Sequence, residues 1–373
     1  MTETTLRGYY LHSLNKNASS SDLAAYGVQK KINAQVKAFN NYFDCKEVIC
    51  YQIDSSTAFN KIKSRLPFTA ISEKWVYGDE YKDIDFIYFR KNIIDYSVVS
   101  FFRKIKKHNP KCKIVLEIPT YPYDKEEFKT LKDLPFKLKD RINRKRLHKY
   151  VDLITIYGSN ETVVFNTPCL VLRNGVDFSD IPIKKAPFHD DRIDIVMIGM
   201  FSHWHGYERM LYGLSNYLKD NGKTLFHLHF VGDGVSIPEY KSITKQLSID
   251  EYVTFYGALS GKELDEVFEK CDIGCDTLGS HRKDVHISST LKTRDYAARG
   301  LPIIGSEKID FIDESFEYFL KLEGNDNPVD YNSIEDFYNN ISKEGLAIKV
   351  RNYALTRIDI NSVIKPIVDF IGK

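Results

Sequence analysis

The sequence lacks the apolar features that carry a chain to or across a membrane. No apolar run is long enough to span a bilayer. The first residues, MTETTLRGYYLHSL, lack the basic stretch and long apolar core of a signal peptide. We therefore expect a cytoplasmic protein, whose only membrane association would be peripheral, on the inner face of the cell membrane.

A surplus of one charge is also missing. The chain has 53 basic and 51 acidic residues, which gives a net charge of +2. Proteins that bind nucleic acid through its phosphates carry a clear basic surplus. The composition therefore argues against a nucleic-acid partner. Disorder is equally disfavoured, because 43% of the residues are hydrophobic and 28% are charged.

Patterns that would hold a metal are scarce. Cys271 and Cys275 could form half of a metal site, but no second pair lies nearby in the sequence. Two His-x-His pairs, at 203–205 and 227–229, have no companion carboxylate or cysteine pattern, and structural histidines fit them better. We predict no metal site.

The residues that are present indicate two α/β domains. A length of 373 residues suits two domains of similar size. Short apolar runs alternate with helical patterns, which is typical of βαβ units and parallel sheets. We predict an N-terminal domain over 1–176, a linker over 177–191, a C-terminal domain over 192–355, and a last helix over 356–373 that packs back on the first domain. Ligands of such doubly wound domains bind outside the carboxyl ends of the strands.

The expected elements follow the apolar runs. Strands are predicted at 7–14, 46–53, 83–90, 112–119, 151–158, 168–174, 192–200, 225–234, 252–259, 271–278 and 301–306. Helices are predicted at 22–43, 96–108, 132–150, 205–220, 261–270 and 288–300, with further amphipathic helices from 333 to the C-terminus.

The segment ISSTLKTRDYAARGLPIIGS carries the most chemical information. A polar cluster, Ser288, Ser289 and Thr290, precedes a helix with Lys292 in its first turn. Backbone N–H groups at a helix start, together with the helix dipole, form an anion site. A lysine there opposes the dipole, so it is a poor choice for stability alone. A bound diphosphate would explain it, and an ordinary helix with a lysine that reaches into solvent would explain it equally well.

This segment resembles the donor site of GT-B glycosyltransferases, in particular glycosyltransferase family four. In that family a helix with an acidic residue five positions before Gly-x-Pro contacts the nucleotide sugar, and Asp295 stands five before Gly300 with Pro302 following. The resemblance implies that Asp295 holds the nucleotide ribose. The family's first Glu of its E-x7-E pattern falls on Ile287 here, so that sugar contact must come from elsewhere.

Other segments resemble the family in the same order, over nearly the whole chain. VMIGMFSHWHGYERML resembles the first strand, loop and helix of the C-terminal domain, with His205-Gly206 where family members often have Lys-Gly. The resemblance implies that the nucleotide sugar is bound by Gly27, Arg209, Gly232, Gly234, Tyr256, Gly257, Leu259, Ser280, His281, Ser288, Ser289, Thr290, Leu291 and Asp295.

In the first half, the loop EIPTYPYDKEE follows a buried strand where the family often has a histidine. Glu117 is our candidate for a protein base or a sugar contact, and Thr120, Tyr121 and Tyr123 are candidates for acceptor binding. Arg90 at another strand end is a further acceptor candidate. A proline-rich turn with packing tyrosines, beside an ordinary strand-end cation, would explain the same residues.

The helix KDLPFKLKDRINRKRLHKY mixes Lys and Arg with Leu, Phe and Ile. A solvated helix face explains this pattern, and so does a surface that docks on anionic lipid. Members of the family often glycosylate lipid-linked acceptors.

The resemblance implies a retaining enzyme of the hexosyltransferase type that needs no metal and no cofactor beyond its nucleotide-sugar co-substrate, with a UDP-sugar favoured. Its acceptor would be a glycan or lipid-linked oligosaccharide in bacterial surface polysaccharide synthesis. Lys292, the helix start at Ser289 and His205 would stabilise the leaving diphosphate. Two alternatives stay open: a sugar-nucleotide epimerase, and a non-catalytic GT-B subunit that binds glycan or stabilises a partner.

Overall fold

The computed structural model describes residues 5–13, 23–52, 58–66, 68–70, 73–124, 133–157 and 159–373. These residues divide into two compact units, which we describe separately. Unit 1 contains the first strand, Ile32–Leu172 and Ile364–Lys373. Unit 2 contains Arg173–Val363. Helix α1 (Leu23–Phe39) has residues in both units.

Unit 1 is built on a seven-stranded sheet. Its strands are parallel except for the pair β8–β9, and their order is β2 (Asp44–Ile49), β1 (Arg7–His12), β5 (Phe86–Arg90), β6 (Lys113–Glu117), β7 (Leu153–Tyr157), β9 (Thr167–Leu172) and β8 (Val163–Val164). The other named elements here are α2 (Ala58–Arg65), α3 (Tyr96–His108), α5 (Leu134–Arg144) and the short pair β3 (Tyr51–Gln52) and β4 (Glu73–Lys74).

Helix α3 illustrates how sequence sets these elements. The Asp95 carboxylate accepts from the backbone N–H groups of Ser97 and Val98, which fixes the helix start. Residues spaced three and four apart, including Val98, Phe102 and Ile105, are buried against the sheet. The helix covers the predicted range 96–108.

Unit 2 is built on a six-stranded parallel sheet. Its order is β12 (Val253–Gly257), β11 (Leu225–Asp233), β10 (Arg192–Met200), β13 (Ile273–Cys275), β15 (Ile303–Gly305) and β17 (Phe319–Lys321). A small ladder joins β14 (Ile287–Ser288) to β16 (Lys308–Ile309). The helices are α6 (Glu208–Lys219), α7 (Ile237–Leu247), α8 (Gly261–Lys270), α9 (Leu291–Arg299), α10 (Tyr331–Asn340) and α11 (Leu346–Ile358). Helix α12 (Ile360–Gly372) begins in unit 2 and belongs to unit 1 from Ile364 onwards.

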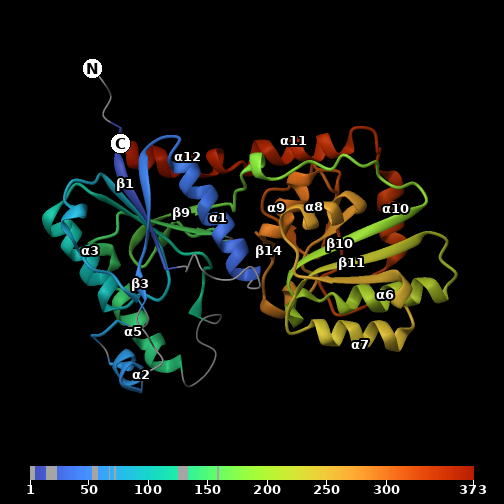
Figure 1. Cartoon of the computed structure of the whole chain (residues 1–373), viewed down its shortest axis with the longest axis horizontal. Helices are drawn as coiled ribbons and strands as arrows, with labels where there is room; N and C mark the ends of the chain where they lie inside the picture. The colour runs from blue at the N-terminus through green and yellow to red at the C-terminus, as the bar shows by residue number, and fades with distance from the viewer. Residues whose placement is uncertain are drawn as a thin grey trace. The chain divides into compact units, whose positions relative to one another are not determined.

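The strand order of unit 2 reverses direction between β10 and β13. Crossovers on one side of this point lie on one face of the sheet, and those on the other side lie on the opposite face, so the loops after β10 and β13 leave a crevice. Figure 1 shows α6 and α7 on one face of the sheet and α8 and α9 on the other. The fold thus selects the loops that follow β10 and β13 as the place for a ligand.

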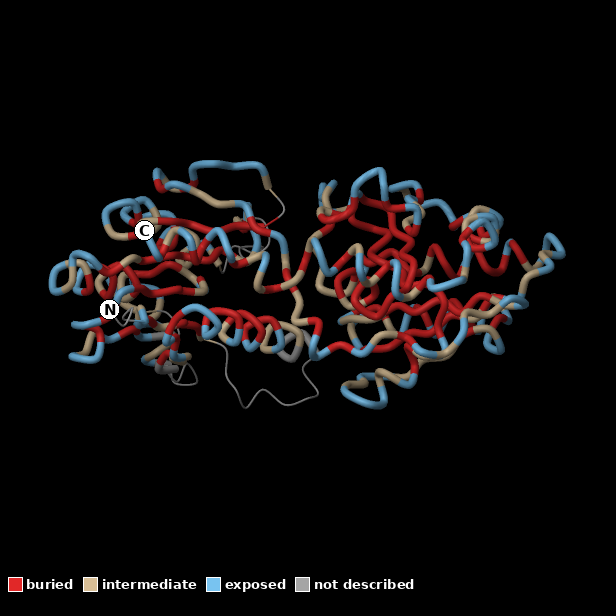
Figure 2. Tube along the Cα trace, turned by 90° about the horizontal axis from the view of Figure 1, so that it is seen from above, coloured by how far each residue is buried: buried red, intermediate tan, exposed pale blue. Residues whose placement is uncertain are grey.

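Two apolar cores hold the layers of unit 2 together. Along β10, Ile195 and Met197 pack into the core under α6 and α7, while Val196 and Ile198 pack into the core under α8, α9 and α11. Such alternation follows from the two-residue period of a strand. In Figure 2 the buried residues run through the interior of each unit.

The predicted linker over 177–191 belongs to unit 2 and packs on it. The Lys184 N–H donates to the Arg299 carbonyl (2.8 Å), and the Glu269 carboxylate accepts from the N–H groups of Lys185 (3.0 Å) and Ala186 (2.8 Å).

The end of α12 belongs to unit 1, where Lys113 Nζ donates to the carbonyl of Phe370 (2.8 Å). Among the described residues, no helix combines the length and apolar character needed to cross a bilayer.

Candidate functional site

Helix α9 begins without a side-chain cap. Its N-cap residue, Thr290, has extended backbone angles, but the hydroxyl donates to Asp276 (2.9 Å) instead of accepting from the helix. The first N–H groups of a helix have no partner within the helix. Because Thr290 is engaged elsewhere, these groups are left for an anion, and the helix dipole adds positive potential at the same place.

Lys292 adds a full positive charge at this helix start. Its side chain is half-buried, and Nζ donates to the hydroxyls of Thr277 (2.9 Å) and Tyr207 (3.1 Å). Burial lowers the pKa of Lys292, while the charge of Asp276 opposes that shift. Among the described residues, no carboxylate lies within ion-pair distance of Lys292. Two hydroxyls therefore hold the ammonium in place, and none of its described contacts is an ion pair.

His205 supplies a neutral donor beside Lys292. The Ser202 N–H donates to Nδ1 of His205 (3.0 Å), so the ring proton of the neutral form is on Nε2. Burial, followed by the charge of Lys292, lowers the pKa of His205 to about 2. A buried imidazole beside an ammonium therefore stays neutral at physiological pH, and its free donor is Nε2–H.

Close backbone contacts bring the surrounding loops together. Gly206 has φ +67, and a Cβ there would lie 2.7 Å from the Gly279 nitrogen. The loops after β10 and β13 are tied at this point, since the Leu278 N–H donates to the His205 carbonyl (2.7 Å). Gly232 and Gly234 were predicted to line the nucleotide pocket. In the structure they allow the end of β11 to lie close to the end of β10 and the residue that follows it, because a Cβ on Gly232 would lie 1.9 Å from the Gly199 oxygen.

Arg209 has a different role from the one predicted. It is 3% exposed, and its guanidinium donates to the carbonyls of Leu278 (2.7 Å), Glu323 (2.9 Å) and Asn327 (2.7 Å) and to Oδ1 of Asn325 (3.1 Å). These bonds use four of the five guanidinium N–H groups, so in this structure Arg209 holds the loop that covers it instead of facing an open donor site. Helix spacing alone did not show that a loop covers this side chain.

The hydroxyls before α9 are committed to carboxylates. Ser288 donates to Asp276 (2.6 Å) and Ser289 donates to Asp310 (2.7 Å). The hydroxyls of Ser288, Ser289 and Thr290 thus fix the loop before α9. We therefore expect a ligand at this loop to contact backbone groups. Leu291, the first residue of α9, is half-buried and contributes the first helical N–H.

The other predicted donor residues of unit 2 lie on or just after β12 and within α9. The hydroxyl of Tyr256 and Nδ1 of His229 share a hydrogen bond (2.9 Å). Gly257 ends β12 with open space where a Cβ would lie, and Leu259 follows two residues later. Asp295 lies 3.4 Å from Arg299 on the same helix. Its role as a ribose contact stays a prediction.

Two residues after β13 complete this set. Ser280 is buried and begins a short 3₁₀ turn. His281 contacts Asp326 through Nε2 (3.0 Å), and its buried Nδ1 has no hydrogen-bond partner among the described residues. An unpartnered ring nitrogen beside Ser280 is a polar group that a ligand can satisfy.

Glu117 in unit 1 is buried, which contradicts its predicted role as base or sugar contact. It is 0% exposed; one carboxylate oxygen pairs with Arg90, and the other accepts from Tyr88 (2.6 Å) and Gln35 (3.0 Å). Register explains the pairing, because Arg90 and Glu117 are opposite each other on β5 and β6. The same pair holds Arg90, whose side chain is 11% exposed, and its role as an acceptor contact stays a prediction.

The loop after β6 divides into buried and exposed positions. Tyr123 is 2% exposed, donates to Asp140 (2.7 Å), and lies under the ammonium of Lys91, so it is a packing residue and not an acceptor contact. Thr120 is exposed and Tyr121 is half-buried, so both remain candidates. Gly27 lies within α1, which begins four residues earlier at Leu23 and falls inside the helix predicted at 22–43, and its role as a donor contact stays a prediction.

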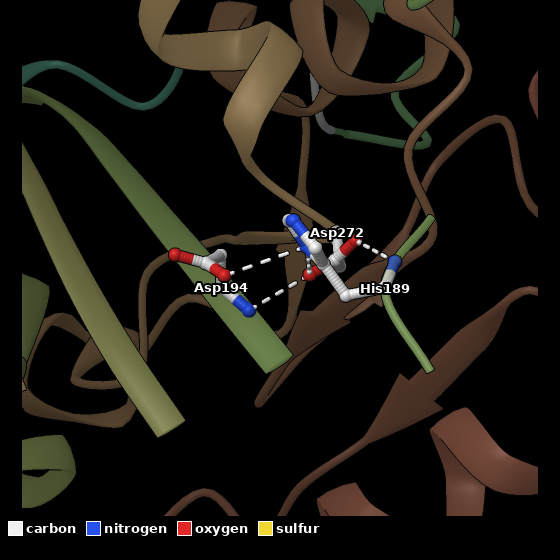
Figure 3. Close-up of side chains that lie close together, drawn as sticks. All are labelled: His189, Asp194 and Asp272. Carbon is white, nitrogen blue, oxygen red and sulfur yellow. Dashed lines mark hydrogen bonds and ion pairs between the residues drawn. The ribbon is translucent and has the colours of Figure 1, made fainter. Parts of the chain in front are cut away.

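A cluster of histidine and aspartate lies at the opposite edge of the unit 2 sheet, where strands begin. His189, Asp194 and Asp272 offer ligand atoms within 4.8 Å of one another (Figure 3). Protein donors already use them: His189 Nδ1 is 2.8 Å from Asp272, and Asp194 pairs with Arg192 (2.7 Å) and His229 (2.7 Å). The neighbouring arginine disfavours a cation, and we assign the cluster to packing.

The sequence interpretation missed the residues that organise this site. Asp276, Thr277 and Tyr207 hold Thr290 and Lys292 in place, and Asp310 holds Ser289. Asp276 and Thr277 directly follow the buried strand β13, at the edge where parallel sheets bind ligands. Their position at a strand end was the available signal.

No family model matches the chain, and no curated protein matches it. Solved structures do. Anabaena Alr3699/HepE in complex with UDP and glucose is similar over 99% of this chain and 100% of its own, with a TM-score of 0.58 and 11% identity. Sucrose-phosphate synthase from Thermosynechococcus elongatus covers 98% of both chains, with a TM-score of 0.62 and 9% identity. A glycosyltransferase from Rickettsia africae covers 98% of both, with a TM-score of 0.60 and 10% identity. These likenesses show the GT-B fold.

Proposed function

We propose that this chain is a glycosyltransferase of the hexosyltransferase type that transfers a sugar from a nucleotide-diphosphate donor, with a UDP-sugar favoured. One observation carries the proposal: the half-buried ammonium of Lys292, without a carboxylate partner among the described residues, lies at the uncapped start of α9. The switch point of the sheet puts this helix start where such folds bind nucleotides. The similar structure of HepE contains UDP in that fold, which supports the same class of donor here.

The proposed mechanism stabilises the leaving diphosphate with groups of this chain. Lys292, the first N–H groups of α9 and Nε2–H of His205 face negative charge that grows as the glycosidic bond breaks. The departing phosphate oxygen takes the proton of the acceptor hydroxyl, on the face that the diphosphate leaves. This path retains anomeric configuration and uses neither a metal nor a protein base, which suits the burial of Glu117.

A panel of nucleoside diphosphates tests the donor class. We expect UDP and a UDP-sugar to raise the melting temperature more than GDP, TDP or ADP and their sugars, because a ligand of the native state stabilises it by about 2.7 kcal/mol at 100 times its Kd. Thermal shift measures this directly. Absence of a shift with every nucleotide would support the non-catalytic subunit instead, and conversion of a UDP-sugar without any acceptor would support the epimerase.

We further propose a glycan or lipid-linked acceptor, in bacterial surface polysaccharide synthesis, reached from a membrane surface. A patch on unit 1, which we name the apolar–basic surface, combines exposed apolar side chains with basic ones. On α5, Leu134, Leu138 and Ile142 recur every four residues and are 49%, 50% and 48% exposed. Lys139 Nζ donates to the Ser64 carbonyl (2.6 Å), which joins α5 to the region of α2. The surface consists of Phe59, Ile62, Lys63, Arg65, Leu66, Phe68, Leu134, Lys137, Leu138, Arg141, Ile142 and Lys145.

Binding to lipid vesicles tests this surface. We expect the protein to sediment with phosphatidylglycerol vesicles and not with phosphatidylcholine vesicles, because apolar insertion and attraction to anionic headgroups act together. The double variant Ile62→Gln/Leu138→Gln should lose more than tenfold in binding, about 1.4 kcal/mol, from two lost apolar anchors. The control Ile348→Gln changes an apolar residue of unit 2 that is 60% exposed, and should bind as before. Equal loss in both variants would contradict the assignment.

A further inference from the structure

Unit 2 has a second concave surface, beside the start of α9. It is an open groove of about 1020 Å³, formed by residues 308–316, 319 and 321 with Arg173 and Arg357. A space of this size is at the upper end for sites that enclose a small molecule, so it accommodates a ligand of several rings.

The groove and the candidate donor site share a wall but are separate. The ladder β14–β16 pairs Ile287 with Lys308, and the Asp310 N–H donates to the Ser288 carbonyl (3.1 Å). On the far side of this wall the chain enters α9, with Lys292 bonded to Thr277 and Tyr207 and not to any groove residue. A ligand in the groove would therefore meet different charges from a diphosphate at α9.

Two of the carboxylates in the groove are already neutralised. Asp310 pairs with the buried Arg294 and accepts from Ser289. Asp313 pairs with Arg357 (3.0 Å), whose guanidinium stacks over the ring of Tyr353 at 3.6 Å. These pairs leave the exposed Glu314 as the one carboxylate of the groove without a described partner.

Three cations of the groove remain without a described partner. Arg173, Lys308 and Lys321 are exposed, and within the described residues none of them forms an ion pair or a side-chain hydrogen bond. Three unpaired cations against one unpaired carboxylate give the rim a positive surplus. Since solvent-exposed cations in a concave surface attract anions, the rim favours a ligand with negative charge.

The floor of the groove is aromatic and apolar. Phe311 and Phe316 are 2% and 5% exposed, and Phe319 is half-buried, so part of its ring is accessible. The side chains of Ser315 and Glu314 add hydroxyl and carboxylate groups at the edge. An aromatic face with polar groups around it suits a sugar ring, which offers C–H groups on its faces and hydroxyls at its rim.

We propose that this groove binds an acidic saccharide, a chain of sugar rings that bear carboxylate or phosphate groups. Phe319 packs against a ring, while Arg173, Lys308 and Lys321 bind its acidic groups. The binding itself does not depend on the reaction catalysed. The further assignment of this saccharide as the acceptor or the growing product rests on the proposed transferase function.

Calorimetric titration of the full chain with defined oligosaccharides tests the proposal. The probes are tetragalacturonate, neutral galactotetraose, glucose 6-phosphate and inorganic phosphate. We expect tetragalacturonate to bind more than tenfold tighter than galactotetraose, and glucose 6-phosphate to bind more tightly than inorganic phosphate. In Lys308→Ala/Lys321→Ala the Kd for tetragalacturonate should rise at least tenfold, because charge-assisted hydrogen bonds are lost.

Two controls distinguish binding in the groove from attraction to the protein's overall charge and from binding at the donor site. Lys349→Ala removes an exposed lysine of α11 outside the groove and should leave the Kd unchanged. UDP binding should be unchanged in the groove double variant. Equal affinity for neutral and acidic probes, equal loss in Lys349→Ala, or inorganic phosphate that competes as well as the saccharide would each overturn the proposal. Failure of every nucleoside diphosphate to bind the unmodified chain would overturn the proposed function, and would leave the saccharide result standing.

Discussion

Replacing Lys292 with alanine is expected to lower transferase turnover about 10²–10³-fold, the range seen when one preorganised donor to a developing anion is removed. The side chain is already in place, held by Thr277 and Tyr207, and no described carboxylate neutralises it. Its charge is therefore available to a leaving diphosphate without rearrangement. Steady-state kinetics with a UDP-sugar, together with calorimetric titration of UDP, measures both the loss of turnover and the loss of binding.

Lys262→Ala is a closely matched control. Lys262 is the second residue of α8, as Lys292 is the second residue of α9. It is 90% exposed and lies 3.8 Å from Glu266 one turn later, so its charge is solvated and partly paired. We expect Lys262→Ala to keep full UDP binding. Equal losses in the two variants would show that helix-start lysines act here only through overall charge.

Thermal stability provides a second measurement on the same variant. A cation at a helix start opposes the dipole, and burial penalises it further, as its lowered pKa reflects. Without ligand, Lys292→Ala should therefore melt no lower than the unmodified chain, while the shift caused by UDP disappears. A large drop in the melting temperature without ligand would indicate a structural lysine and contradict the donor-site assignment.

Many of the strands and helices could be predicted from the sequence, because apolar residues recur at a different spacing in strands than in helices. The strand predicted at 192–200 and the helices predicted at 96–108 and 261–270 have the predicted bounds. Short elements escaped this reasoning. The two-residue strands β14 and β16 pair through tertiary contacts and carry no period of their own. Helix α7 was also missed: it begins with Pro at its first turn, in a segment we did not assign.

Sequence patterns predicted where the elements around the candidate site begin and end, and did not predict which protein groups its side chains contact. The helix predicted at 288–300 follows from signals within a few residues, namely the polar cluster before it and Gly300 after it, and α9 begins at Leu291 within that range. Arg209 and Glu117 instead find partners 69 to 118 residues away or on a neighbouring strand. Sequence spacing does not encode such contacts, so it did not show that protein groups hold Glu117 at the end of β6 and Arg209 in α6.

Glu117→Gln is expected to destabilise unit 1 by about 3–5 kcal/mol, the usual cost of removing one partner from a buried ion pair. The amide cannot neutralise Arg90, whose guanidinium is then left with 11% side-chain exposure and no counter-charge. Burial alone would lower the pKa of Arg90, but Glu117 more than offsets this and the pKa is raised. The same carboxylate accepts from Tyr88 and Gln35, so one substitution disturbs three buried partners.

Urea denaturation together with kinetics separates this structural role from catalysis. Because Glu117 is 0% exposed, we expect a much lower urea midpoint, and turnover per folded molecule close to that of the unmodified chain. Glu161→Gln makes the same chemical change at an exposed position of unit 1 and should leave both quantities unaltered. A strong loss of turnover at unchanged stability would restore Glu117 as a base. That result would require the Arg90 pair to open during the reaction, since a base must reach the proton that it removes.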